Sequence, residues 1–284
     1  RPWVQVAAPA VLRNLKDPSS GIDQLRDLAL QGPASIAILQ ACTDDRKRKF
    51  ALARVRRTDL IETELSGIPL VIARTGYTGE DVGFEIFVHP DQQVTLWKML
   101  LDKGKPFGLK PCGLAARDST RTEAGLPLYG HELVGPFDIS PAEAGFPGYI
   151  KYHKPFFIGR DPLMERDQKR TRELIRWRMN QKGVRRPDTS CPVVNKQGQV
   201  IGHVTSCSID SEGYLLGLAI VESRYNVEGM PIGIFVLPPS GKPQAEKAKP
   251  ELAVGDRALL HVEATVLGRF LPKRMATLPA KTED

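Results

Sequence analysis

Residues 74–87 read R-T-G-Y-T-G-E-D-V-G-F-E-I-F, and the rest of the chain is organised around this stretch. Three glycines punctuate it, namely Gly76, Gly79 and Gly83. Because β-forming runs lie on both sides, at 70–73 and 84–88, the glycines indicate a turn with positive φ or a close approach to the backbone. The turn places an aromatic ring, Tyr77, near a carboxylate, Glu85. A carboxylate on an otherwise apolar strand either faces solvent or binds something.

Length and composition set the general class of the protein. The chain has 284 residues, of which 41% are hydrophobic and 26% are charged. These values are typical of a globular protein long enough for two domains. No apolar run approaches the roughly 18 residues of a membrane-spanning helix, so we predict no membrane partner. The chain begins at Arg1 with no visible targeting segment, which we interpret as a processed or truncated product.

The cysteines and histidines are scattered. The four cysteines are Cys42, Cys112, Cys191 and Cys207. They form no C-x-x-C or Cys/His cluster, so we predict no metal site. Their sparse spacing favours a reducing compartment, either a bacterial or archaeal cytoplasm or the mitochondrial matrix. We expect each thiol to be buried and inert.

Positive charge is concentrated in one region. The net charge is +7, and seven arginines and lysines fall within residues 46–57 with no acid among them. We interpret this region as a solvated basic loop, with an anionic ligand tail or an acidic carrier protein as the alternative partner. Only Phe50 offers a ring for base stacking there, so we predict no nucleic-acid partner.

Hydrophobic spacing predicts the elements of the first 170 residues. Strands are expected at 27–30, 60–65, 70–73 and 84–88, and helices at 34–40, 90–101, 114–124 and 160–171. The helix at 90–101 is expected to bury one face made of Val94, Trp97, Leu100 and Leu101, and both Trp97 and Trp177 are expected in the core.

The helix at 114–124 should stop at Gly125 and carries two arginines on one face, Arg117 and Arg121. The residues alone leave two readings of this pair. The arginines either bind a carboxylate or form ion pairs with Asp118 and Glu123.

The pattern changes near residues 168–173. Beyond that point short apolar runs recur at even spacing, at 193–194, 200–204, 214–221, 232–237 and 258–266. Gly, Pro, Asn and Asp separate them, which is typical of a small all-β barrel or sandwich. We therefore predict two domains, 1–170 and 171–284. The proline- and lysine-rich segment 238–251 is expected to be an exposed loop or hairpin insertion.

Five segments of the chain form one further pattern. They are L-Q-G-P at 30–33, the stretch at 74–87, A-A-R-D-S-T-R-T-E-A-G-L-P-L-Y-G-H-E-L at 115–133, K-P-F-F-I-G-R-D-P-L at 154–163 and I-G-H-V-T-S at 201–206. Together they resemble the aminomethyltransferase family, which comprises the T-protein of the glycine cleavage system and its folate-dependent relatives. Their order and spacing agree with the family across nearly the whole chain.

The resemblance implies an α+β fold, a folate-binding cloverleaf with a C-terminal all-β barrel domain. It also implies that tetrahydrofolate is contacted by Tyr77 and Glu85, that Arg117 pairs with the carboxylates of the glutamyl tail, and that Arg274 reaches the folate from the C-terminal end. A carboxylate suits the 2-amino and ring N–H edge of a pterin because it accepts two hydrogen bonds. An aromatic ring can pack beside the pterin.

Two features depart from the family pattern. Val82 is inserted where the family reads G-E-D-G, which is expected to reshape the turn before Glu85. The family also has a region before the start of this chain that carries part of the folate lobe and the catalytic aspartate. No segment here matches that region, so the 1–170 lobe is partial and the catalytic residue is unknown.

The implied activity is tetrahydrofolate-dependent one-carbon transfer. In the glycine cleavage version an aminomethyl group on a lipoyl carrier protein (H-protein) reacts with tetrahydrofolate to give methylenetetrahydrofolate and ammonia. A close alternative is a folate-dependent S-, O- or N-demethylase that acts on a small methyl donor. A non-enzymatic folate-binding relative in iron–sulfur assembly would carry the motif K-G-C-Y-x-G-Q-E. The corresponding region here, 154–160, has no cysteine.

Overall fold

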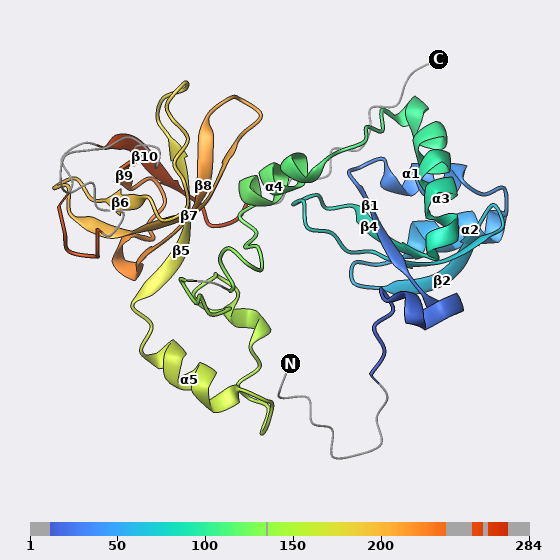
Figure 1. Cartoon of the computed structure of the whole chain (residues 1–284), viewed down its shortest axis with the longest axis horizontal. Coiled ribbons are helices and arrows are strands. Elements are labelled where there is room, and N and C mark those ends of the chain that lie inside the picture. The colour runs from blue at the N-terminus through green and yellow to red at the C-terminus, as the bar shows by residue number, and fades with distance from the viewer. Residues whose placement is uncertain (1–11, 135, 237–251, 258–260, 272–284) are drawn as a thin grey trace. The chain divides into compact units, whose positions relative to one another are not determined.

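The computed structural model describes residues 12–134, 136–236, 252–257 and 261–271 (Figure 1). The chain divides into two compact units, Arg1–Cys112 and Gly113–Asp284. The predicted change at 170/171 coincides with the start of the first barrel strand at Arg172. Residues 113–170 nevertheless group with the barrel, so the compact units do not follow the predicted limits. The two domains that the sequence predicts, a folate lobe at 1–170 and a barrel domain at 171–284, therefore stay a prediction.

The first unit is an antiparallel sheet covered on one face by helices (Figure 1). The sheet order is β1-β4-β3-β2. The strands are β1 (Arg26–Gln31), β2 (Leu60–Leu65), β3 (Ile68–Ala73) and β4 (Gly83–Val88), and the helices are α1 (Ser35–Ala41), α2 (Arg46–Arg54) and α3 (Pro90–Gly104), with short 3₁₀ turns η1 (Pro18–Asp23) and η2 (Lys105–Phe107). All four predicted strands are therefore present.

One face of this sheet makes the core of the unit. Phe84, Ile86 and Val88 alternate along β4 and pack with helix residues such as Leu39 and Leu96. Since successive strand residues point to opposite faces, the residues between them lie on the face that the helices do not cover. Glu85 is one of these residues.

Two predictions for this unit are wrong. Residues 46–54 form helix α2 and not a loop, because Asp45 caps its start and Leu52 is fully buried. In α3 the buried positions are Leu96, Leu100 and Gly104, while Val94 is exposed and Trp97 is 39% exposed. The prediction that Val94 and Trp97 belong to the buried face of α3 therefore placed that face wrongly by part of a turn. Leu100 is buried as expected.

The second unit is a closed barrel with two α-helices and long loops attached (Figure 1). The strand order is β10-β5-β8-β7-β6-β9. The strands are β5 (Arg172–Met179), β6 (Pro192–Val194), β7 (Val200–Ile209), β8 (Leu215–Glu222), β9 (Pro231–Ile234) and β10 (Val262–Leu267), and the other elements are α4 (Leu114–Glu123), η3 (Pro147–Tyr149), α5 (Arg160–Gln168) and η4 (Ser223–Tyr225). Of the two sequence readings, barrel or sandwich, the barrel is confirmed.

In the barrel core a tryptophan packs against a glycine on the neighbouring strand. Trp177 is fully buried, as predicted, and lies against Gly217 on the paired strand β8. A Cβ at Gly217 would come within 2.5 Å of the Trp177 ring, so only glycine fits beside the indole. The predicted loop at 238–251 lies outside the described residues.

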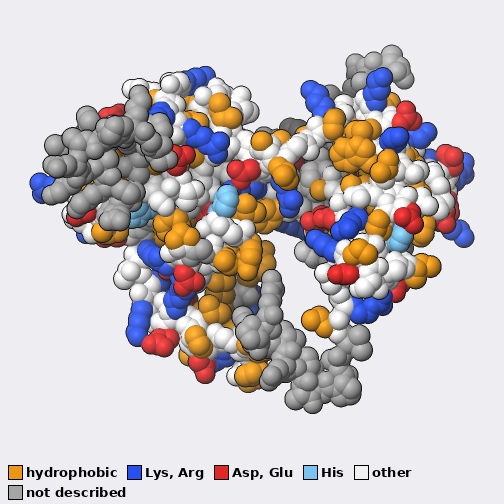
Figure 2. All heavy atoms as spheres, viewed as in Figure 1, with side chains coloured by type: hydrophobic (Ala, Val, Ile, Leu, Met, Phe, Trp, Pro, Cys, Tyr) orange, Lys and Arg blue, Asp and Glu red, His pale blue; other side chains and the backbone are white. Residues whose placement is uncertain are grey.

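Charges of both signs are mixed over the surface that Figure 2 shows. Lysine and arginine side chains alternate there with aspartate and glutamate on both units, and hydrophobic side chains are scattered among them. Among the described helices, none is long and apolar enough to cross a membrane.

Candidate functional site

The turn between β3 and β4 is closed by a side chain from β1. Gln31 ends β1 and donates from Nε2 to the carbonyl oxygens of Thr75 and Phe84, at 3.3 Å each. Its Oε1 accepts a hydrogen bond from Thr78 Oγ1 at 2.9 Å. One side-chain amide therefore forms hydrogen bonds with both ends and with the middle of the turn at residues 75–84.

The glycines of the turn are explained by this amide. A Cβ on Gly76 would lie 2.0 Å from Gln31 Oε1, and a Cβ on Gly83 would lie 2.3 Å from the same atom. Gly79 instead has a φ of 83°, which favours glycine. Both reasons that the sequence offered for glycine, close approach and positive φ, are present in one turn.

Glu85 lies at the centre of the sheet on its uncovered face. In β4 it pairs with Ala29 of β1 on one side and with Ala73 of β3 on the other. The small side chains of these two alanines leave space on either side of the half-buried Glu85 carboxylate. The Thr75 hydroxyl donates a hydrogen bond to Glu85 Oε2, which fixes the carboxylate beside the turn that carries the half-buried Tyr77.

The inserted Val82 does not disturb the strand. Its side chain packs against the core of the first unit, and its carbonyl oxygen accepts a hydrogen bond from Gly32 N at 2.9 Å. That bond continues the β1–β4 ladder beyond the Gln31–Gly83 pair. The ladder runs in unbroken register from Gly83 to Glu85, so Val82 leaves the strand position of Glu85 regular.

The two arginines of α4 have different environments. Arg121 is 1% exposed and pairs with Asp118, with Glu132 at 3.3 Å and with Ser206 Oγ at 2.9 Å. The ion-pair reading is thus confirmed for Arg121 with Asp118. Arg117 is exposed, and its side chain makes no hydrogen bond or ion pair with any residue in the described parts of the chain.

The predicted ligand residues do not all lie in one unit. Tyr77 and Glu85 come together at one turn of the first unit, whereas Arg117 belongs to the second unit. Arg274 lies outside the described residues. Sequence reasoning missed Gln31, Thr75 and Thr78. Gln31 stands in the L-Q-G-P segment, which was the one signal available.

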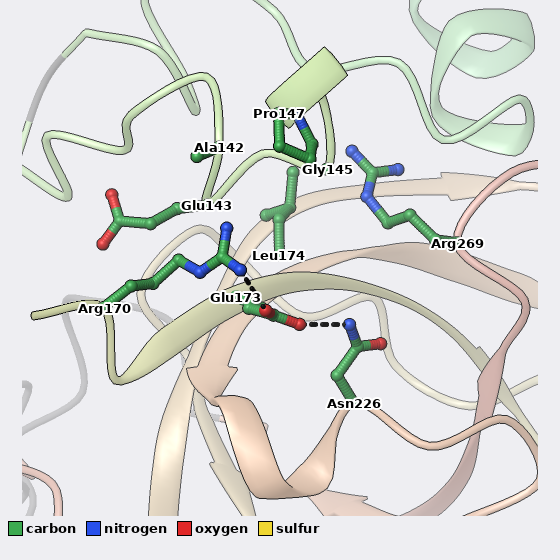
Figure 3. Close-up of a pocket in the computed structure, with 9 residues that line it drawn as sticks. All are labelled: Ala142, Glu143, Gly145, Pro147, Arg170, Glu173, Leu174, Asn226 and Arg269. Carbon is green, nitrogen blue, oxygen red and sulfur yellow. Dashed lines mark hydrogen bonds and ion pairs between the residues drawn. The ribbon is translucent and has the colours of Figure 1, made fainter. Parts of the chain in front are cut away.

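A cavity of about 220 Å³ lies in the second unit, and its lining includes none of the predicted ligand residues that the structure describes (Figure 3). Its charged lining is paired internally. Arg170 contacts Glu173 at 3.3 Å, and Asn226 donates to Glu173 at 2.6 Å. Glu143, another lining residue, is held by Arg166 at 2.7 Å and Arg172 at 2.8 Å. We therefore assign this cavity a structural role.

The four cysteines lie in different settings. Cys42, Cys191 and Cys207 are buried, as predicted, but Cys112 is exposed, which corrects the prediction for that residue. Burial raises the pKa of Cys42 to about 11 and that of Cys207 to about 12. Within the described residues, no group of three or more His, Cys, Asp or Glu side chains is arranged to hold a metal ion.

Comparison with known proteins identifies the family. The sequence model of the GCVT N-terminal domain matches residues 3–154, just over half of the chain. The chain belongs to the GCVT family. Its relatives include an aminomethyltransferase of Caldanaerobacter subterraneus subsp. tengcongensis, 38% identical over 75% of this chain and 55% of the relative. An aminomethyltransferase of Alkaliphilus metalliredigens is 39% identical over 75% of this chain and 56% of the relative.

The fold of this GCVT family member also matches a solved structure. Glycine cleavage system aminomethyltransferase T from Bartonella henselae is 25% identical and gives a TM-score of 0.64, over 86% of this chain and 59% of that protein. The predicted α+β fold with a β-barrel is therefore confirmed. The chain spans about half the length of the curated relatives it matches.

Proposed function

We propose that this chain carries the folate-binding face of a tetrahydrofolate-dependent aminomethyltransferase of the glycine cleavage type. One observation supports this most directly. Glu85 presents a carboxylate on the uncovered face of the inner strand β4, with alanines on both sides and Thr75 fixing one oxygen.

The residues of the turn fit a pterin. Glu85 would accept hydrogen bonds from the 2-amino group and ring N–H of tetrahydrofolate, and Tyr77 would pack beside the ring system. Arg117, exposed on α4, would pair with the carboxylates of the glutamyl tail through its planar guanidinium. Bound tetrahydrofolate supplies the N5 atom that takes up the one-carbon unit.

The proposed donor is an aminomethyl group on the lipoyl arm of a carrier protein, with ammonia as the second product. A demethylase would use the same pterin site, and the aminomethyltransferase names of the relatives favour the glycine cleavage reaction. The proposal assigns folate binding to this chain and leaves the catalytic acid unassigned. The predicted compartment, cytoplasm or mitochondrial matrix, is likewise part of the proposal.

Isothermal titration of tetrahydrofolate into the chain tests the proposal. Glu85→Ala should weaken binding roughly 10-fold to 100-fold, because a hydrogen bond to a charged group contributes about 1.5–3 kcal/mol. Glu62→Ala is the matched control, since Glu62 is an exposed carboxylate on the same sheet face in β2. A parent chain that binds no tetrahydrofolate, or a Glu62→Ala variant that loses as much affinity as Glu85→Ala, would sink the proposal.

A further inference from the structure

We infer that Gln31 is a positioning residue for the ligand, and that Gly76 and Gly83 are glycines because its amide occupies the space beside them. This inference rests on the proposed function, since the groups that Gln31 positions are Tyr77 and Glu85. It adds a residue from a different strand, β1, to the pterin turn.

The hydrogen bonds of Gln31 all reach residues far away in sequence. The carbonyl oxygens of Thr75 and Phe84 lie 44 and 53 positions along the chain from the amide that donates to them. Thr75 is also the residue whose hydroxyl holds Glu85, and Tyr77 lies between Thr75 and Thr78. The amide thus acts on the neighbours of both proposed ligand groups.

The Gln31 amide fills the space beside both glycines. At Gly76 the three nearest atoms to an added Cβ all belong to the Gln31 amide, at 2.0, 2.7 and 2.8 Å. The same is true of Gly83, at 2.3, 2.6 and 2.7 Å. Neither glycine has a left-handed φ, so backbone conformation does not account for them.

Gln31→Glu separates the donor role of the amide from its shape. A carboxylate has nearly the same size and still accepts from Thr78, but when ionised it cannot donate to the two carbonyl oxygens. Its charge would also lie on the same sheet face as the Glu85 carboxylate, because residue 31 pairs with Gly83, two positions before Glu85 in β4. Two carbonyls and a like charge favour the protonated form, which regains one O–H donor. Tetrahydrofolate binding by this variant should therefore tighten as the pH falls from about 8 to about 6.

The first experiment measures two properties of the parent, Gln31→Leu and Gln31→Glu. Hydrogen exchange of peptides covering residues 74–86 reports whether the turn loosens, and titration calorimetry reports the tetrahydrofolate Kd. We expect faster exchange confined to that turn and roughly 10-fold weaker binding at pH 8 for both variants, with a pH-dependent recovery for Gln31→Glu alone.

The second experiment tests the steric pairing. Gly76→Ala should weaken tetrahydrofolate binding in the parent but have little further effect in a Gln31→Ala background, since the clashing amide is then gone. Gly148→Ala is the control, because a Cβ there meets nothing within 4 Å and Gly148 has no left-handed φ.

The outcomes separate this inference from the proposed function. A turn that loosens in Gln31→Leu while Kd stays unchanged would overturn the positioning role and leave the proposed function standing. Equal losses from Gly76→Ala with and without Gln31 would overturn the steric claim. A parent that binds no tetrahydrofolate would overturn the proposed function and the ligand role of Gln31 together.

Discussion

Glu85 and Glu143 show how the partners of a carboxylate decide its role. Two arginines and the backbone N–H of Ser140 surround Glu143, so its charge is balanced within the second unit. Glu85 has a threonine hydroxyl and makes no ion pair among the described residues. Its charge is therefore open to N–H donors on a ligand, which is the difference on which the proposed function depends.

The setting of Glu143 gives a prediction about acid stability. Burial raises the pKa of Glu143, but the Ser140 N–H, Arg172 and Arg166 outweigh burial and hold it below the ordinary value of 4.5. A carboxyl with a lowered pKa in the folded state stabilises the fold above its unfolded pKa and loses that contribution as the pH falls through the folded pKa. Glu143→Gln should therefore cost about 1.5–3 kcal/mol of unfolding free energy near pH 7 and progressively less in acid.

Urea unfolding of the parent and Glu143→Gln at several values between about pH 7 and about pH 3 checks this expectation. Glu165→Gln is the control, because Glu165 is exposed and pairs with Lys169 on the surface of α5. The two curves should converge as the pH falls. Parallel curves would show that the ionised form of Glu143 is not what stabilises the second unit.

At the scale of elements, the sequence predicted what periodicity and turn residues encode. The strands of the first unit, the helix α4 that stops just before Gly125 with its φ of 78°, and the barrel after residue 170 are all present. Helix α2 was not predicted, because its run of basic residues was interpreted as a solvated loop. In the structure Asp45 caps this helix and Leu52 is buried in it. The contacts of Gln31 could not be predicted, since their partners are brought near only by the β1–β4 register.

Helix α2 also carries charges that oppose its dipole. Its first turn contains Arg46, Lys47 and Arg48 and no acid, although the N-terminus of a helix favours negative charge. Lys47→Glu should therefore raise the unfolding free energy by about 0.3–1 kcal/mol at low salt, and less at high salt. Lys103→Glu, in the last turn of α3, should lower it by a similar amount. Urea denaturation at two salt concentrations measures both, and a Lys47→Glu variant less stable than the parent would contradict this account.

At the scale of the whole molecule, the family resemblance came from segments distributed over both units. The turn at 74–87 lies in the first unit, and the segments at 115–133 and 201–206 lie in the second. In the second unit these two segments meet, because Arg121 of α4 bonds Ser206 of β7 and Ser119 donates to the Ile209 carbonyl at 2.9 Å. Arg121, for which the residues alone left carboxylate binding and ion pairing open, therefore holds α4 on the barrel.

Thiol reactivity tests this description of both units at once. Cys112 is exposed, whereas Cys42 is buried in the first unit and Cys191 and Cys207 are buried in the second. With pKa values of about 11 and about 12, Cys42 and Cys207 are almost entirely protonated near pH 8, and the thiolate is the reactive form. Iodoacetamide near pH 8 should thus label Cys112 alone in the native chain, as read by peptide mass spectrometry, and a Cys112→Ser variant should take up no rapid label. In increasing urea, labelling of Cys42 reports the opening of the first unit, and labelling of Cys207 reports the opening of the second.

Rapid labelling of Cys42 or Cys207 in the native protein would contradict the packing described for the unit that contains it.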